Sequence, residues 1–156
     1  MKIPTLLASL TAGIIVLGGC QAPAAQFTAQ DQTTLRAMFD SVASEVGSGR
    51  WDTWAGHYTE DAILQPPNAP TVSGRAGLLA WGRAFPPVES VAFSDVQVSG
   101  EGNLAYGTSA YALKLKDFPL DTGKQLVVFR RSAGGAWEIQ AVSFGSDLPP
   151  ATVPAK

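Results

Sequence analysis

The stretch Lys124-Gln125-Leu126-Val127-Val128-Phe129-Arg130-Arg131 indicates the architecture of this chain. It is rich in β-branched and aromatic residues, which favour extended backbone. Because successive side chains of a strand point to opposite faces, the stretch divides into two sets of residues. One face carries Gln125, Val127 and Phe129, and the other carries Leu126, Val128 and Arg130.

Three more stretches with the same period of two lie around it: Val88–Ser99, Leu104–Leu115 and Trp137–Phe144. Short breaks that contain glycine separate neighbouring stretches, and this favours antiparallel pairing. In the first stretch the alternation of apolar residues slips between Phe93 and Val96. This slip predicts a β-bulge or a bend.

The residues before these strands follow helical spacing. Thr28 and Asp31 form a variant capping box at the start of a first helix, which ends at Gly47. Its apolar stripe consists of Leu35, Met38, Phe39, Val42, Ala43 and Val46. Another helix is expected to begin at Gly74 and to stop at Pro86.

Between these two helices, a short helix is expected to start near Asp52. Trp54, His57, Tyr58 and Asp61 follow at spacings of three, four and seven residues. These four side chains share one face if the helix continues as far as Asp61.

Helices followed by an antiparallel meander predict an α+β fold. We expect about four long strands and one short strand, Ala62–Gln65, in a curved antiparallel sheet packed on three N-terminal helices. Three helices cover only one face of such a sheet. If the sheet curves, the two layers enclose a cone-shaped pocket.

The start of the chain has the features of a secretory signal. Lys2 precedes an uncharged run, Pro4–Gly19, which is shorter than the roughly twenty residues that a membrane span needs. The run ends in Leu17-Gly18-Gly19-Cys20, which resembles a bacterial lipobox; an ordinary cleaved signal with an incidental cysteine is the alternative. We expect a signal peptide over 1–19, a lipidated Cys20 and tether over 20–27, one domain over 28–149 and a flexible tail over 150–156.

Removing the leader leaves 137 residues, with ten basic and thirteen acidic side chains and a net charge near −3. This balance argues against a nucleic-acid partner. The lone Cys20 and the lone His57 make neither a disulfide framework nor a usual zinc site, so we expect no metal and no cofactor. The expected partner is the lipid bilayer, through acylated Cys20. Gln21, where an aspartate often signals inner-membrane retention, favours the periplasmic face of the outer membrane if the cell is Gram-negative.

The residues that carry a family resemblance are spread over the whole domain. They are Trp51-Asp52, Tyr58–Ala62, Pro66–Pro70, Gly74-Arg75, Gly123–Arg131, Trp137–Ile139 and Ser146-Asp147. Together they resemble a SnoaL-like domain, a member of the superfamily of nuclear transport factor 2 and ketosteroid isomerase. The resemblance implies a curved antiparallel sheet around a conical pocket. It does not imply one function, because the superfamily holds isomerases, cyclases, dehydratases, ligand binders and catalytically silent dimer modules.

The resemblance also allows a comparison with isomerase chemistry. In ketosteroid isomerase an Asp base removes a proton next to a carbonyl, while a Tyr and a neutral Asp stabilise the enolate oxygen. The alignment implied by the resemblance places these three groups at Pro66, Val42 and Val127. Proline and valine exchange no protons, so this isomerase mechanism is not expected here.

His57 is the only histidine and a candidate general base near neutral pH, with Asp61 as its orienting carboxylate. Two other interpretations of His57 stay open: a pocket-lining residue without chemistry, and a partly buried histidine satisfied by a carbonyl or by water. For Asp61 the alternative is a structural carboxylate that binds backbone amides at the turn into the strand.

The expected pocket lining consists of Trp54, His57, Tyr58, Trp81, Gln125, Val127 and Phe129. The resemblance to the isomerase places the last three on the concave face. Aromatic rings in a cavity favour flat or apolar ligands, but they equally favour a filled core.

Three hypotheses of function therefore remain. The first is a lipid-anchored envelope protein whose conical pocket binds a small, largely apolar molecule. The second is a proton-transfer or hydration enzyme that uses His57 and Asp61. The third is a non-catalytic module that forms a homodimer through its convex sheet face, with Leu126 and Val128 in the interface.

Overall fold

Nine elements follow one another in residues 26–149, the part of the chain that the computed structural model describes. They are α1 (Ala29–Gly47), α2 (Trp51–Gly56), β1 (Tyr58–Gln65), β2 (Val72–Ser73), α3 (Arg75–Arg83), β3 (Val88–Glu101), β4 (Leu104–Leu115), β5 (Leu120–Arg131) and β6 (Trp137–Ser146). The expected signal peptide, lipidated Cys20 and C-terminal tail lie outside the described residues. No helix within 26–149 is both long and apolar enough to cross a membrane.

The first helix begins where its capping residues predict. The Thr28 hydroxyl accepts a hydrogen bond from the Asp31 backbone N–H, and the Asp31 carboxylate accepts one from the Thr28 N–H at 2.8 Å. Leu35 and Phe39 form the buried face of the helix. The Gln32 side-chain amide donates to the Val98 carbonyl oxygen at 2.9 Å, which ties α1 to β3.

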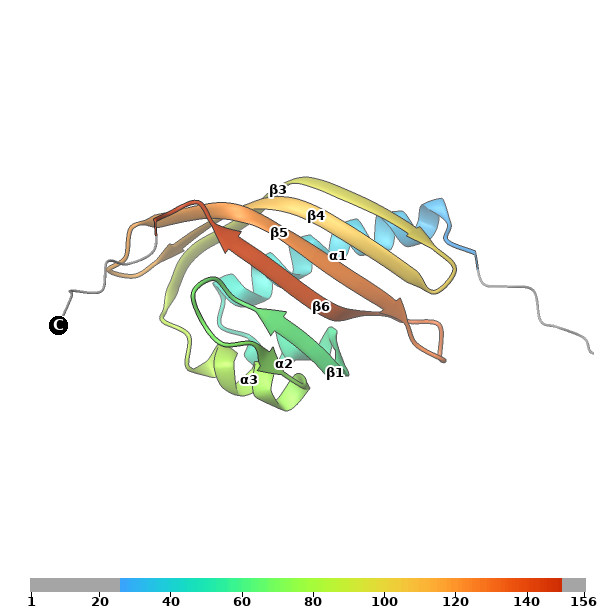
Figure 1. Ribbon diagram of the computed structural model, residues 1–156, viewed down its shortest axis with the longest axis horizontal. Coiled ribbons are helices and arrows are strands. Elements are labelled where there is room, and N and C mark those ends of the chain that lie inside the picture. Colours follow the sequence, from blue (N-terminus) through green and yellow to red (C-terminus); the bar gives the residue numbers. More distant parts are fainter. Residues whose placement is uncertain (1–25, 150–156) are drawn as a thin grey trace, which may run out of the picture.

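The six strands form one open, curved sheet in the order β2-β1-β6-β5-β4-β3, and the helices lie on one side of it (Figure 1). The predicted α+β arrangement and the antiparallel meander of four long strands are confirmed. The sheet is nevertheless mixed, because β1 pairs in parallel with β6. A two-residue strand, β2, pairs in antiparallel orientation with the other edge of β1. Local periodicity does not predict the pairing of β1 with β6, since the two strands are far apart along the chain.

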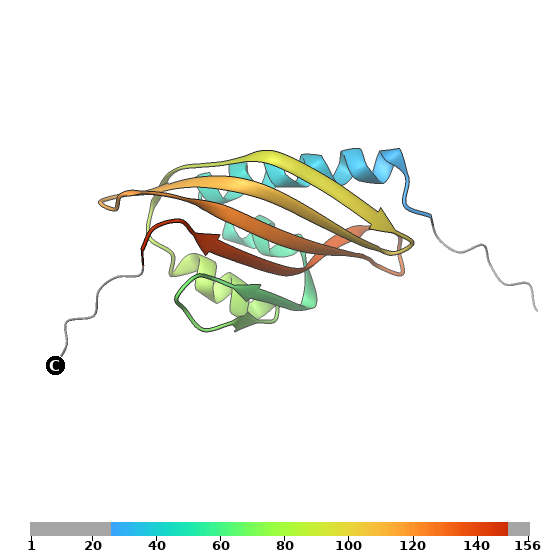
Figure 2. The same ribbon diagram turned by 45° about the horizontal axis from the view of Figure 1, so that its top comes forward.

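The sheet is curved (Figure 2), and β3 contains a bulge that contributes to this curvature. The register of β3 with β4 shifts between Ser94 and Gln97, and Asp95 in this interval has a φ of 54°. This is the bulge that the slip of the apolar pattern predicts. Bulges increase the local twist and bend the strand, so β3 curves over the helical layer.

One element differs from the prediction in a way that changes the site. Helix α2 ends at Gly56 and β1 starts at Tyr58, so the expected helical face that joins Trp54 to Asp61 is wrong. Pairing with β6 overrides the helical spacing here. The His57 carbonyl oxygen accepts a hydrogen bond from the Ile139 N–H at 2.8 Å, and Tyr58 then lies in register with Ile139.

Candidate functional site

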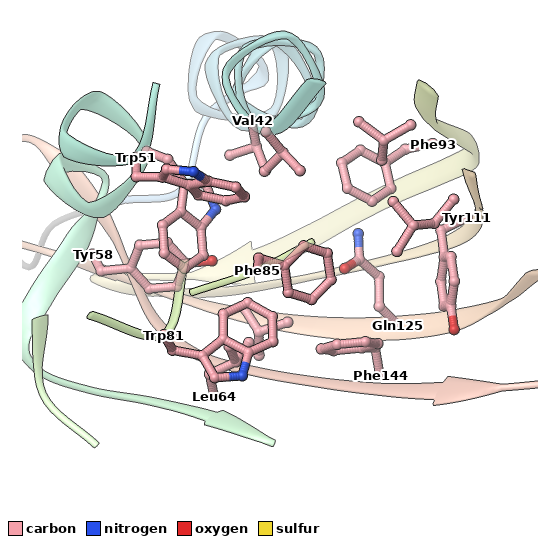
Figure 3. Close-up of a pocket in the computed structure, with 15 residues that line it drawn as sticks. Val42, Trp51, Tyr58, Leu64, Trp81, Phe85, Phe93, Tyr111, Gln125 and Phe144 are labelled. Carbon is pink, nitrogen blue, oxygen red and sulfur yellow. The ribbon is translucent and has the colours of Figure 1, made fainter. Parts of the chain in front are cut away.

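A hollow lies between the helices and the concave face of the sheet (Figure 3). It contains about 630 Å³ of space between atoms, part of which is open to solvent. All three helices and all strands except β2 contribute to its wall. The lining residues are Val42, Val46, Trp51, Trp54, Tyr58, Leu64, Trp81, Phe85, Val91, Phe93, Tyr111, Leu113, Gln125, Val142 and Phe144.

Aromatic rings form the helical side of this cavity. Trp54 packs edge-on against Trp51 with 5.6 Å between ring centroids, and against Tyr58 with 4.9 Å. Trp81 lies 4.7 Å from Phe85 in a tilted arrangement. Because these rings restrain one another, the wall is largely formed before any ligand enters.

A second hollow continues deeper under α1. It shares Val42, Tyr58, Phe93, Gln125 and Val142 with the first hollow. Its other lining residues are Met38, Phe39, Val127, Phe129 and Ile139. The face of β5 that carries Gln125, Val127 and Phe129 is therefore the concave face, as the alternation and the resemblance predict.

Besides the indole N–H groups of Trp51, Trp54 and Trp81, three lining residues of the main cavity carry polar groups. The Gln125 side-chain amide donates to the Ser109 hydroxyl at 3.0 Å. The Tyr111 hydroxyl donates to Asp121 at 3.1 Å. Tyr58 is buried against Trp54. The rest of the wall is apolar.

The electrostatics of the cavity favour neutral molecules. Burial raises the pKa of Tyr58 above its ordinary value. Burial and the neighbouring Asp121 carboxylate raise the pKa of Tyr111. Both phenols thus stay protonated at neutral pH, and the cavity wall contains no Lys, Arg, His, Asp or Glu side chain among the described residues.

The predicted pair of His57 and Asp61 is not formed. His57 lies outside the cavity lining, and its Nε2 is 3.0 Å from a carboxylate oxygen of Glu45 on α1. Asp61 lies on β1 and pairs with Arg130 at 3.0 Å, where both side chains are largely exposed. The early end of α2 separates the two residues, because a strand carries Asp61 away from the helical face.

Six of the seven expected lining residues lie in the walls of the two hollows, and His57 lies in neither. Trp54, Tyr58, Trp81 and Gln125 line the main cavity, and Val127 and Phe129 line the deeper hollow. The contributions of α1, β3, β4 and β6 were missed, for example Val46, Phe93 and Tyr111. Strand alternation contained a signal for two of them, because it puts Phe93 on the same face as Val91 and Tyr111 on the same face as Leu113. In the structure Phe93 and Tyr111 lie directly opposite each other in the β3–β4 pair.

Comparisons with known proteins agree with this architecture. Residues 35–143 match the family model described as the SnoaL-like domain. No protein with a curated description is significantly similar in sequence.

Several solved structures share the fold at low sequence identity. An NTF2-like protein of unknown function from Pseudomonas putida has a TM-score of 0.69 and 14% identity over 80% of this chain and 92% of that one. A ketosteroid isomerase-like protein from Erwinia carotovora atroseptica has a TM-score of 0.66 and 17% identity over 78% of this chain and 100% of that one. A protein of unknown function with a cystatin-like fold from Nostoc punctiforme has a TM-score of 0.69 and 14% identity over 81% of this chain and 96% of that one. At these identities the likeness establishes the fold alone.

Proposed function

The chain belongs to the SnoaL-like domain family, and from this premise we propose that it binds a small, largely apolar molecule in the cavity between its helices and its curved sheet. Family membership leaves the chemistry open, because one fold serves many functions. The observation that carries the proposal is the cavity itself, with its wall of aromatic and aliphatic side chains and its few polar groups. Ligand pockets in proteins are lined in the same way, mostly by apolar and aromatic side chains with a small number of polar groups that orient the ligand.

The alternative of a proton-transfer enzyme loses its support in the structure. A general base must lie within hydrogen-bond reach of the proton that it removes. His57 faces Glu45 outside the cavity, and Asp61 faces Arg130. The two phenols that do line the cavity have raised pKa values, which makes them poor proton donors at neutral pH.

The binding proposal can be tested by filling the cavity. Val46 lines the cavity from a partly buried position on α1, and Val46→Trp puts an indole into the space. The matched control is Ser41→Trp, which places the same side chain on the exposed side of the same helix. We expect native mass spectrometry of protein purified from its own membranes to show a retained small molecule in the parent and control, and none in Val46→Trp. A ligand-free parent protein contradicts the proposal.

We further propose that Cys20 is lipidated and holds the protein at the cell envelope, on the periplasmic face of the outer membrane if the cell is Gram-negative. The lipobox-like tetrad before Cys20 supports this location. Phe27, at the start of the described domain, packs edge-on against Trp137 at the end of the sheet where β6 begins. Leu113 of the cavity lies near the β4–β5 turn, at the opposite end of these strands. A tether from the N-terminus therefore leaves the cavity end of the domain free.

A second candidate function is that of a homodimerising module. Apolar side chains are exposed on the convex face of the sheet, opposite the helices: Leu104 at 58%, Tyr106 at 52% and Leu126 at 45%. Tyr106 lies in register with Val128, so these residues cover adjacent strands. Contiguous exposed apolar surface of this kind is typical of interaction sites.

A further inference from the structure

The Gln125 amide is held in one orientation inside the cavity. Gln125 on β5 lies in register with Ser109 on β4, and its Nε2 donates to the Ser109 hydroxyl at 3.0 Å. Ser109 is itself only 5% exposed, so this hydrogen bond is shielded from water. Figure 3 shows the amide oxygen on the side of Phe85. With the nitrogen bonded to Ser109, the oxygen faces the cavity and can accept a hydrogen bond there.

This acceptor has no donor within the domain. Among residues 26–149, the hydrogen bonds of the Gln125 side chain consist of the one to Ser109, and its oxygen accepts none. The oxygen is not among the buried side-chain atoms that lack a partner, so it is accessible from the cavity, and covering it without a donor costs free energy. A ligand that brings an O–H or N–H group to this point recovers that cost, whereas a ligand with only ether or ketone oxygens does not.

The Tyr58 phenol is a second polar group of the cavity, and it suits a hydroxyl in particular. Tyr58 lines the same two hollows as Gln125 and stays protonated, so its phenol keeps a proton to donate. A hydroxyl group both donates and accepts, and therefore matches an amide oxygen and a phenol together.

The walls restrict the rest of the ligand. Charged molecules are disfavoured, because none of the Lys, Arg, His, Asp or Glu residues within 26–149 lines the cavity and burial of an unpaired charge is costly. The rings of Trp54, Trp81 and Phe85 offer edge and face contacts to another ring.

From these observations we propose that the ligand is a neutral hydroxylated ring compound of the phenol type, whose hydroxyl donates a hydrogen bond to Oε1 of Gln125. This inference rests on the proposed function, since it names the ligand class of the same cavity. It assigns Gln125 as the residue that determines specificity.

The experiment uses three probes that share one ring system: naphthol, its methyl ether and naphthoate. Binding to the full chain is measured by titration calorimetry at pH 7, where the hydroxyl of naphthol is neutral. We expect naphthol to bind about 3- to 10-fold more tightly than the ether, the range that one neutral hydrogen bond gives. In Gln125→Leu this preference is lost, so that naphthol and its ether bind with equal affinity. Gln97→Leu, the same substitution at an exposed position of β3, keeps the preference.

The outcomes separate the two proposals. Equal binding of naphthol and its ether to the parent protein overturns the role of Gln125 and leaves the apolar cavity as a binding site. Naphthoate as the tightest probe overturns the preference for neutral ligands. If none of the three binds, both proposals fail. The comparison in the parent protein needs no variant, and Gln125→Met provides a second test if circular dichroism shows that Gln125→Leu does not fold.

Discussion

At the scale of single residues, Asp31 connects the start of α1 to the end of the sheet. It accepts a hydrogen bond from the Trp137 ring N–H at 2.9 Å and lies 2.8 Å from the Arg131 guanidinium. Arg131 also stacks over the Trp137 ring at 4.5 Å. The neighbouring Arg130 also pairs with a carboxylate of the domain, that of Asp61.

This arrangement predicts a pH dependence of stability. The hydrogen bonds from Trp137 and Thr28, with a smaller effect of Arg131, hold the pKa of Asp31 well below its usual range. A carboxyl with a lowered folded-state pKa stabilises the fold above its unfolded value of about 4, and this contribution is lost as the pH falls toward the folded-state pKa. We expect Asp31→Asn to unfold at lower urea concentration than the parent at pH 7, with the difference narrowing below pH 4 or so.

The control for this prediction is Asp40→Asn, on the exposed side of the same helix. It should leave the urea midpoint close to that of the parent over the whole pH range. A difference between parent and Asp31→Asn that stays constant below pH 4 or so contradicts the assignment, because the effect is then independent of the carboxyl's ionisation.

His57 has a structural partner that sequence spacing did not indicate. Glu45 is only 6% exposed, and its carboxylate faces His57 Nε2 across the junction of α1 and α2. Replacing His57 by Ala leaves this buried carboxylate without that partner, so we expect a loss of about 1–3 kcal/mol in the free energy of unfolding. Because His57 does not line the cavity, ligand affinity should not change.

Urea unfolding of His57→Ala, Glu45→Ala and the double variant measures the coupling between the two residues. The double variant should lose less stability than the sum of the single variants. If His57→Ala keeps its stability but loses ligand binding, the structural role is contradicted and His57 belongs to the binding site.

At the scale of elements, the sequence predicted what local patterns determine. The capping box at Thr28, the four long strands and the bulge near Asp95 all follow from residues close together in the chain. The parallel pairing of β1 with β6 and the partner of His57 depend on contacts between distant segments. Periodicity carries no information on such contacts, so the helical spacing of Trp54, His57 and Asp61 does not reveal that the helix ends at Gly56 and that β1 carries Asp61.

The packing of α3 against α2 gives a prediction at this scale. Gly82 faces the tryptophans of α2, and a Cβ at this position would lie 2.7 Å from a ring carbon of Trp51. Gly82→Ala improves helix propensity by about 1 kcal/mol, but overpacking costs typically 1–3 kcal/mol. We expect the cost of overpacking to exceed the gain in helix propensity, so Gly82→Ala should unfold at a lower urea concentration. It should also bind the apolar probes more weakly, because Trp51 has to shift.

The same helix provides the matched control. A Cβ at Gly77 would meet Val72 at 3.7 Å, an ordinary contact. Gly77→Ala should therefore stabilise the protein by about 0.5–1 kcal/mol through helix propensity alone. If both variants stabilise the protein equally, α3 does not pack on Trp51 as closely as described.

At the scale of the whole molecule, the two faces of the sheet have different surfaces. The concave face is covered by helices and contains the cavity, whereas the convex face has no covering element among residues 26–149 (Figure 1). Three large apolar residues on the convex face are about half exposed. A cavity on one face and an apolar patch on the other allow ligand binding and self-association together, because neither uses the other's surface.

The convex face gives the last prediction. We expect the parent protein to form dimers through Tyr106, Leu126 and their neighbours, since stable interfaces bury about 800 Å² per partner and this face is the largest uncovered surface of the sheet. Tyr106→Lys with Leu126→Lys places like charges opposite one another across a two-fold interface, and sedimentation velocity over a concentration series should then show monomers. The control is Phe118→Lys, which replaces an equally exposed aromatic side chain, at 52%, in the β4–β5 turn away from this face. Phe118→Lys should leave the dimer intact. A parent protein that is monomeric at every concentration rules out the interface.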